Sequence, residues 1–184
     1  MISFYLSVVE TDEDRDKIVF IYENYYSFMC YSAGQVLKGN THDVEDAVHN
    51  AMLKIIDRLD MIDVENAGRA KYLCGIIARN TAKDHLKRKD NQTLRLDETF
   101  CDMPDGEPEP DEIVIRRDVH GIMLRAIRSL DERYRDVCIL RYVHGYKERE
   151  ISELLGLPQG TVSTRISRAK QILREELRKE SVYV

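Results

Sequence analysis

Apolar and tyrosyl side chains recur every three or four residues in the first half of the chain. This spacing predicts three helices that each bury one face, at residues 14–37, 43–59 and 69–88. Lys38-Gly39-Asn40 interrupts the first pattern, and Thr41 to Asp43 supplies N-cap candidates for the second helix. No segment shows the alternation typical of a strand. The pattern predicts one compact all-α domain over residues 1–90.

The expected core of this domain comes from the inner stripes of its helices. The first helix contributes Ile18, Ile21, Tyr22, Tyr25, Tyr26, Met29, Ala33, Val36 and Leu37. The second contributes Val44, Val48, Ala51, Ile55 and Leu59. The third contributes Leu73, Ile76, Ile77 and Thr81.

Residues 91–111 break the helical pattern. They hold three of the four prolines, and seven acidic residues stand there against Arg95 alone. Few apolar side chains are available to pack such a segment, so it is expected to be an irregular, acidic linker. One interpretation of this segment is a solubilising tether.

The remaining residues, 112–184, predict a second helical domain. Its apolar spacing indicates four helices, at about 112–129, 131–143, 148–155 and 159–179. Ser129 and Asp131 are expected to cap the second of these, and Gly145 to end it. Gly156 tolerates the positive φ that stops a helix, and Pro158 suits the first turn of the next one. The last helix has an inner stripe of Val162, Ile166, Ala169 and Leu173.

The outer face of that last helix is polar and basic. It is formed by Ser163, Thr164, Ser167, Arg168 and Gln171. A short helix, a tight turn and a second helix with such a face is the geometry that enters a DNA major groove. Two solvated helices of an ordinary bundle are the alternative. The Gly-Leu-Pro turn and the hydroxyl and arginine face occur together, which favours a helix-turn-helix.

Charge supports binding to nucleic acid only in parts of the chain. The formal net charge is −5, but residues 69–89 hold seven basic residues against Asp84 alone. Residues 112–184 hold fifteen basic and eleven acidic residues, so the acidic segment separates two basic zones that attract phosphate.

Cysteine usage and hydropathy exclude several other classes. The four cysteines are far apart and no histidine lies at metal-ligand spacing to one of them, so we expect free thiols and neither metal nor cofactor. No apolar run is long enough to span a membrane, and the N-terminus lacks the features of a signal peptide. A cytoplasmic location is expected.

Three segments in this order resemble a bacterial RNA polymerase sigma-70 family factor of the small, two-domain extracytoplasmic-function (ECF) type. They are DVEDAVHNAMLKIIDRL at 43–59, YLCGIIARNTAKDHLKRK at 72–89 and the stretch from Leu130 to Leu173. The resemblance implies that the protein binds core RNA polymerase at its clamp coiled coil and flap, and promoter DNA. It implies an anti-sigma factor as a further partner. For the acidic segment 91–111 it implies a second interpretation besides the tether, in which the segment mimics the charge of a nucleic acid.

The resemblance also implies roles for single residues. The residues implied to bind polymerase are Asp43, Asp46, His49, Asn50 and Lys54. Recognition and opening of the minus-ten element falls to Asn66, Tyr72, Arg79, Asn80, Lys83, Lys87 and Arg88. Reading of the minus-thirty-five element falls to Ser163, Thr164, Arg165, Ser167 and Arg168.

This chain departs from the family pattern at three places. His49-Asn50 stands where members commonly have Gln-Glu, which alters the polymerase contact. Leu73 stands where members often have tryptophan, and Tyr72 is the candidate stacking platform instead. Ser163 and Ser167 are smaller than the residues often found there, so they are expected to act through water or on phosphate.

Other functional classes make different predictions. A stand-alone helix-turn-helix regulator would carry a receiver or ligand-binding domain in residues 1–90, and neither pattern is visible. An enzyme acting on nucleic acid would need carboxylates clustered on a rigid scaffold, whereas the acidic residues cluster in the linker. A module that only binds proteins would not need a basic recognition helix.

Overall fold

The computed structural model describes residues 2–38, 40–90 and 125–181, and all regular elements within them are helical. The chain divides into two compact units, residues 1–107 and 108–184, each considered by itself below. The prediction of an all-α protein with two helical units is confirmed. The predicted linker at 91–111 and most of the predicted helix at 112–129 lie outside the described residues.

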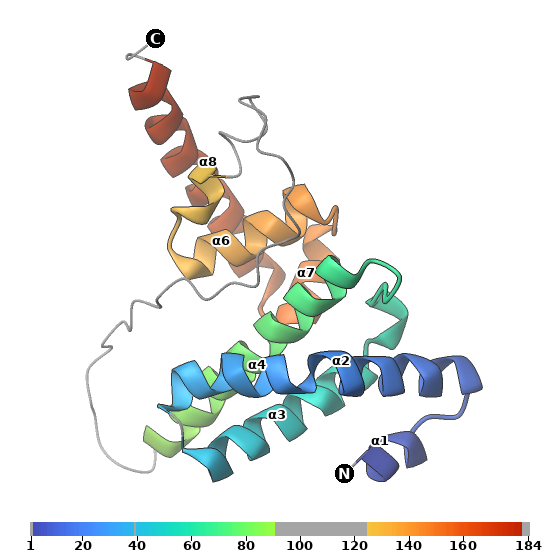
Figure 1. Cartoon of the computed structure of the whole chain (residues 1–184). Helices are drawn as coiled ribbons and strands as arrows, with labels where there is room; N and C mark the ends of the chain where they lie inside the picture. Colours follow the sequence, from blue (N-terminus) through green and yellow to red (C-terminus); the bar gives the residue numbers. More distant parts are fainter. Residues whose placement is uncertain (1, 39, 91–124, 182–184) are drawn as a thin grey trace. The chain divides into compact units, whose positions relative to one another are not determined.

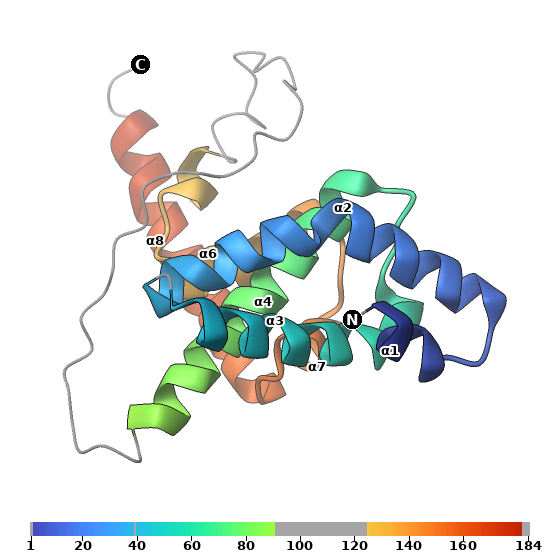
Figure 2. The ribbon, with the colours of Figure 1, turned by 60° about the horizontal axis from the view of Figure 1, so that its bottom comes forward.

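The first unit is built on three long helices, α2 (Asp12–Leu37), α3 (Thr41–Ile56) and α4 (Ala67–Asp90) (Figure 1). Each of the three packs against the other two. A short 3-10 turn, η1 (Leu59–Met61), lies between α3 and α4. The sequence pattern did not predict the N-terminal helix α1 (Ile2–Ser7), which lies against α2 and α3 (Figure 2).

The buried side chains of this unit follow the predicted stripes closely. Every residue predicted to face inward from α3 and α4 is buried, including Leu59 just beyond α3 and the polar Thr81. On α2, Ile18, Ile21 and Met29 are fully buried, whereas Tyr22 and Tyr26 are only half-buried. Tyr5 of α1 adds a fully buried aromatic ring that the periodicity did not reveal.

Both boundaries of the predicted second helix differ from the prediction. The N-cap of α3 is Asn40, whose Oδ1 accepts from the Asp43 amide at 3.5 Å, so the prediction of a cap between Thr41 and Asp43 is wrong. Asn40 already has extended backbone dihedrals, which makes it the last residue outside the helix. The helix also ends at Ile56, and the 3-10 turn then carries Leu59 into the core.

Helices α2 and α4 approach each other closely at Gly75. A Cβ atom there would lie 2.6 Å from Cε1 of Phe28 and 3.4 Å from Oγ of Ser32, both on α2. A glycine inside a helix costs about 0.5–1 kcal/mol relative to alanine, so its presence here needs a reason. The space occupied by Phe28 is that reason, and it fixes the separation of the two helices.

The second unit contains α6 (Glu132–Cys138), the π-helical turn η2 (Ile139–Val143), α7 (Glu148–Leu155) and α8 (Gln159–Ser181). Residues 125–128 are also helical. The prediction of one regular helix over 131–143 is wrong in its second half. There the His144 amide donates to the Ile139 carbonyl at 3.0 Å, five residues back rather than four.

Of the two residues predicted to cap α6, Asp131 caps it and Ser129 does not. Asp131 is the N-cap, and its Oδ1 accepts from the Arg133 amide at 3.0 Å. Ser129 does not cap this helix, because its hydroxyl donates to the Ala126 carbonyl at 2.9 Å. Gly145, with φ of 76°, follows the end of the π turn as predicted.

The turn between α7 and α8 follows the predicted chemistry. Gly156 has φ of 64° and caps α7 in the left-handed conformation. The Ser152 hydroxyl donates to the Leu157 carbonyl at 2.6 Å and so closes the turn. Pro158 precedes α8 instead of lying in its first turn, and its carbonyl accepts from the amides of Thr161 and Val162. The predicted inner stripe of α8 is buried throughout: Val162, Ile166, Ala169 and Leu173.

Among the described residues, no helix is long and apolar enough to cross a membrane, and no group of side chains could hold a metal ion. Cys30, Cys74 and Cys138 are free thiols, as expected. Cys74 and Cys138 are buried and Cys30 is half-buried. Burial raises the pKa of Cys74 to about 12 and that of Cys138 to about 11, so both behave as small core residues.

Candidate nucleic-acid and polymerase interfaces

Helix α8 presents a polar face opposite its buried stripe. Ser163, Thr164, Ser167 and Arg168 are exposed, and Arg165 is partly exposed. All five residues predicted to meet the minus-thirty-five element therefore lie where a ligand can reach them. Because α7 and the Gly156 turn pack behind α8, this face stands out from the unit as a DNA-reading helix requires.

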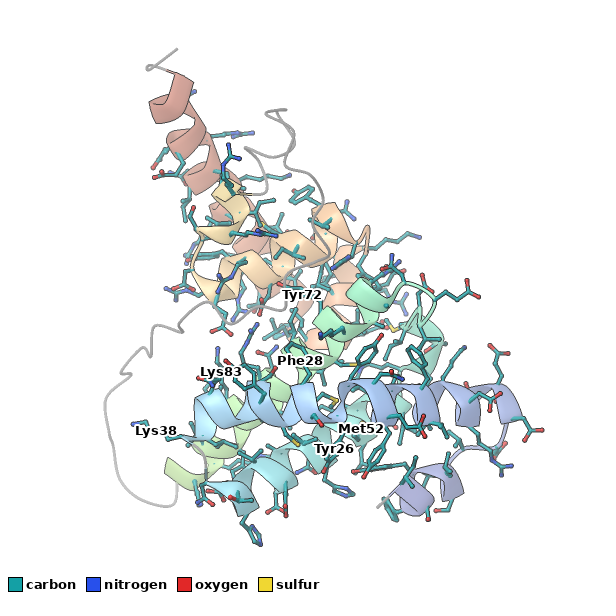
Figure 3. All side chains as sticks on the ribbon, viewed as in Figure 1. Tyr26, Phe28, Lys38, Met52, Tyr72 and Lys83 are labelled. Carbon is teal, nitrogen blue, oxygen red and sulfur yellow. The ribbon has the colours of Figure 1, made fainter. Side chains whose placement is uncertain are left out.

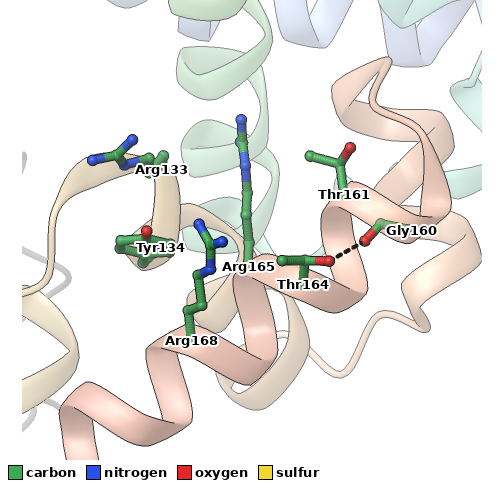
Figure 4. A pocket seen from close by; sticks show the side chains of 7 residues that line it. All are labelled: Arg133, Tyr134, Gly160, Thr161, Thr164, Arg165 and Arg168. Atoms are coloured by element: carbon green, nitrogen blue, oxygen red, sulfur yellow. Dashed lines mark hydrogen bonds between the residues drawn. The ribbon is translucent and has the colours of Figure 1, made fainter.

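A hollow of about 350 Å³ lies beside the first turns of α8. It is lined by Arg133, Tyr134, Gly160, Thr161, Thr164, Arg165 and Arg168 (Figure 4). The Thr164 hydroxyl donates to the Gly160 carbonyl at 2.7 Å. The sequence analysis missed Arg133 and Tyr134, because only the packing of α6 on α8 brings them to the recognition helix.

Helix α4 carries the basic zone predicted to meet the minus-ten element. Figure 3 labels Tyr72 and Lys83, both of which belong to this helix. Lys87 and Arg88 are exposed. The other four predicted residues on this helix are partly buried: Tyr72, Arg79, Asn80 and Lys83. The basic residues are therefore placed on one helix, partly buried at Arg79 and Lys83 and exposed at Lys87 and Arg88.

Asn66 lies at the start of α4 and already has a structural task. Its Oδ1 accepts from the Arg69 amide at 3.1 Å, and its own amide donates to Asp63 Oδ1 at 3.4 Å. The side chain is exposed. Its role in capturing a flipped base remains a prediction, and that role has to be compatible with capping α4.

Three of the five predicted polymerase-binding residues are engaged inside the first unit. Asp43 bonds to Lys89 and His85 of α4, with Nζ at 2.6 Å and Nε2 at 3.2 Å, and its side chain is only 13% exposed. The Lys89 ammonium, followed by His85, holds the pKa of this carboxyl below its usual range. Lys54 Nζ lies 3.1 Å from Thr81 Oγ1 and 3.5 Å from Asp84 Oδ2.

His49 is covered by the N-terminal helix. Its Nδ1 lies 3.0 Å from the Tyr5 hydroxyl, and the rings of Phe4 and Tyr5 lie 5.6 and 5.5 Å from its own. Burial raises the pKa of Tyr5 to about 12, which keeps this phenol protonated at neutral pH. The remaining two residues, Asp46 and Asn50, are exposed and form the accessible part of the predicted surface.

The helical units and the exposed recognition helix define a DNA-binding protein of the helix-turn-helix class. Comparison with known proteins goes further, because residues 21–92 match the model of Sigma-70 region 2 and residues 120–173 that of Sigma-70, region 4. The chain belongs to the sigma-70 family, as a factor of the ECF type.

Curated relatives agree with this assignment. The chain is 28% identical over 169 residues to the ECF RNA polymerase sigma factor SigW of Bacillus subtilis, which covers 88% of this chain and 87% of SigW. It is 28% identical over 139 residues to the ECF RNA polymerase sigma-E factor of Escherichia coli K12, covering 71% and 72%. A solved complex of the sigma factor RpoE with the anti-sigma factor NepR from Bartonella quintana aligns with TM-score 0.39 and 16% identity over 91% of this chain and 98% of that chain.

Sigma factors bind core RNA polymerase and promoter DNA, and they direct promoter-specific initiation without being enzymes themselves. The expected function is confirmed at this level. A stand-alone regulator, which the second domain alone permitted, is excluded because region 2 is present as well.

Proposed function

We propose that this sigma factor initiates transcription through three surfaces with separate tasks. The exposed face of α3 holds the clamp coiled coil of core polymerase, α4 opens the minus-ten element, and α8 reads the minus-thirty-five element. The domains that carry these tasks are residues 1–90 and 112–184, joined by the acidic segment 91–111. The work takes place in the cytoplasm, where polymerase and promoters meet.

The observation that carries the proposal is the two-sided character of α8. Its inner stripe is buried, and its outer face offers hydroxyls and arginines side by side. Arg168 is suited to bidentate hydrogen bonds with guanine, while Ser163, Thr164 and Ser167 can donate to or accept from base edges and phosphates. Arg165 lies at the edge of this face and is suited to a phosphate.

Opening of the minus-ten element is assigned to α4 on grounds of charge and stacking. Tyr72 offers an aromatic surface for an unstacked base, and the helix continues into Lys83, Lys87 and Arg88. Arg79 and Asn80 supply hydrogen-bond donors between these two parts. Asn66, which caps the start of the helix, is assigned to the same surface.

For polymerase binding the geometry favours Asp46 and Asn50 as direct contacts. Both are exposed on α3, and Asp46 Oδ2 lies 3.4 Å from His42 Nδ1, a contact at the surface that a partner can exchange. Asp43, His49 and Lys54 support this surface from within the unit. An anti-sigma factor that covers α3 would block binding to polymerase, and one that covers α8 would block recognition of the minus-thirty-five element.

Run-off transcription with purified core RNA polymerase tests the proposal. The templates are a pool of upstream regions from the source genome, transcribed with and without this protein. Discrete transcripts that appear only with the protein support it, and alignment of their start sites gives both promoter elements. Absence of any such transcript, although the protein co-elutes with the polymerase, would contradict promoter selection.

A further inference from the structure

Three guanidinium groups from two helices border the hollow beside the start of α8. Arg165 and Arg168 come from α8, and Arg133 comes from α6 on the opposite wall (Figure 4). The guanidinium carbon of Arg133 lies 5.1 Å from the centre of the Tyr134 ring, a cation–π distance that holds the side chain against the wall. Its Nε lies 3.1 Å from Asp131 Oδ1.

The positive charge of this hollow favours binding of an anion. Its seven lining residues include three arginines and no acid, and Asp131 is bonded to one of the three from outside the lining. Hydroxyls of Tyr134 and Thr161 add hydrogen-bond donors around the same space, whereas the Thr164 hydroxyl already donates to the Gly160 carbonyl. The positive end of the α8 dipole contributes in the same direction, because Gly160 and Thr161 lie in the first turn. Like charges gathered in this way are stabilised when a phosphate lies between them.

The position of the hollow decides which phosphate it suits. Thr164, Arg165 and Arg168 line the hollow and also belong to the face proposed to meet the minus-thirty-five element. DNA that lies against that face carries one charge per 3.4 Å along each strand, so a backbone phosphate comes within reach of the hollow. Arg165 is the arginine of α8 assigned to that phosphate, and Arg168 stays available to a base. A free anion would have to be displaced before the DNA could bind.

We propose that the hollow binds a backbone phosphate of the promoter DNA at the minus-thirty-five element, and that Arg133 closes it from α6. This inference rests on the proposed function of α8. It adds a DNA contact outside the helix-turn-helix and so a second point at which the domain is fixed on the duplex. A phosphate contact of this kind sets the register of the recognition helix without reading sequence itself.

The first test measures how salt affects promoter binding by the holoenzyme, assembled from core polymerase and the full chain. Arg133→Gln is compared with Arg174→Gln, which removes the same charge from an exposed site on α8 outside the hollow. Loss of one phosphate contact should lower the slope of log K against log salt by about 0.9 in Arg133→Gln only. The loss in affinity should be the same on promoters with altered minus-thirty-five bases. An unchanged slope and affinity would overturn the proposal.

The second test removes the charge from the DNA instead. Neutral methylphosphonates are placed one at a time along the minus-thirty-five element, and wild type is compared with Arg133→Gln at each position. At one position the neutral group should strongly weaken DNA binding by wild type and hardly affect binding by Arg133→Gln. The reason is that the variant has already lost the contact between Arg133 and that phosphate. Equal weakening of both proteins at every position would show that Arg133 touches no phosphate.

Two controls keep the outcomes separate. Arg133→Lys keeps the charge and should retain the salt slope, whereas a merely structural role for the guanidinium, through Asp131 or Tyr134, would lower thermal stability without changing the slope. If the wild-type holoenzyme selects no promoter at all, the proposed function fails before the hollow is tested. If it selects promoters and Arg133→Gln behaves like Arg174→Gln, only the inference about the hollow fails.

Discussion

Asp43 and Lys89 form an ion pair across 46 residues of sequence, with the ammonium 2.6 and 2.8 Å from the two carboxylate oxygens. The pair joins the first turn of α3 to the last turn of α4. It connects the helix proposed to meet polymerase with the helix proposed to meet the minus-ten element. Asp43 is therefore a residue that positions both surfaces from inside the unit.

Breaking this ion pair should destabilise the first unit in a pH-dependent way. The pKa of Asp43 is lowered by Lys89 and then by His85, so the carboxylate stabilises the fold above the usual aspartate pKa of about 3.9 and loses that effect as the pH falls through its lower value. Asp43→Asn should therefore lower the melting temperature at pH 7 and have a smaller effect at pH 3. Thermal unfolding of both proteins at the two pH values measures this. An equal difference at both would contradict it.

Gly75→Ala should destabilise the protein by about 1–3 kcal/mol, because the added methyl group overlaps the Phe28 ring. Gly34→Ala is the matched control. At Gly34, near the end of α2, a Cβ atom would meet only Val44 Cγ2 at 3.9 Å, which is ordinary contact. That substitution should stabilise by about 0.5–1 kcal/mol. Urea unfolding of the two variants should give shifts of opposite sign, and stabilisation by Gly75→Ala would mean that α2 and α4 do not meet closely here.

Lys38→Gly should stabilise the first unit by about 0.5–1 kcal/mol. Lys38 caps α2 with φ of 53°, a left-handed conformation that costs a residue with a side chain about 1–2 kcal/mol, and part of the gain is lost to unfolded-chain entropy. Glu23→Gly, at an exposed position inside the same helix, should instead cost about 1 kcal/mol. Chemical denaturation provides both values. A loss of stability in Lys38→Gly would argue against the left-handed cap.

Arg168→Ala should cost about 1–3 kcal/mol in binding to the preferred promoter and relax preference at one base pair. The reason is that an exposed arginine on the reading face can form two hydrogen bonds to one guanine. Binding of the holoenzyme to promoters with each base at each minus-thirty-five position measures the preference. Equal weakening on all of these promoters would make Arg168 a phosphate contact only.

The thiols of Cys74 and Cys138 should resist alkylation in the folded protein. Burial raises their pKa to about 12 and about 11, so almost no thiolate forms at pH 8, and neither sulfur is exposed. Iodoacetamide treatment followed by peptide mass spectrometry should label both only after denaturant is added. Rapid labelling of either one in the native protein would show that its helix opens locally.

The helices that bury a full stripe were predictable from the sequence. The spacing of Ile151, Leu154 and Leu155 before Gly156 gave the bounds of α7, and the stripe of α8 gave its exposed face. Local chemistry decides such features, because a helix needs only its own periodicity and its caps. The sequence could not reveal α1, since six residues are too few to establish a period.

Contacts between distant segments were beyond the sequence for a different reason. Asp43 has the appearance of an exposed residue in a helical first turn, and only the crossing of α3 and α4 brings Lys89 to it. Arg133 is likewise one charge among several in its segment until α6 packs on α8. Spatial proximity of this kind depends on helix packing and not on spacing along one helix.

The wide turn at Ile139–Val143 holds one residue more than an α-helical turn between the same two ends would hold. Homologous chains that lack this residue could close the hydrogen-bond ladder as a regular helix and leave α6 and α7 where they are. A single-residue gap in an alignment of such chains therefore belongs inside this turn. If the gap is left out, residues beyond this turn are aligned one position off, and the helix face assigned to each is wrong by about 100° around the helix axis.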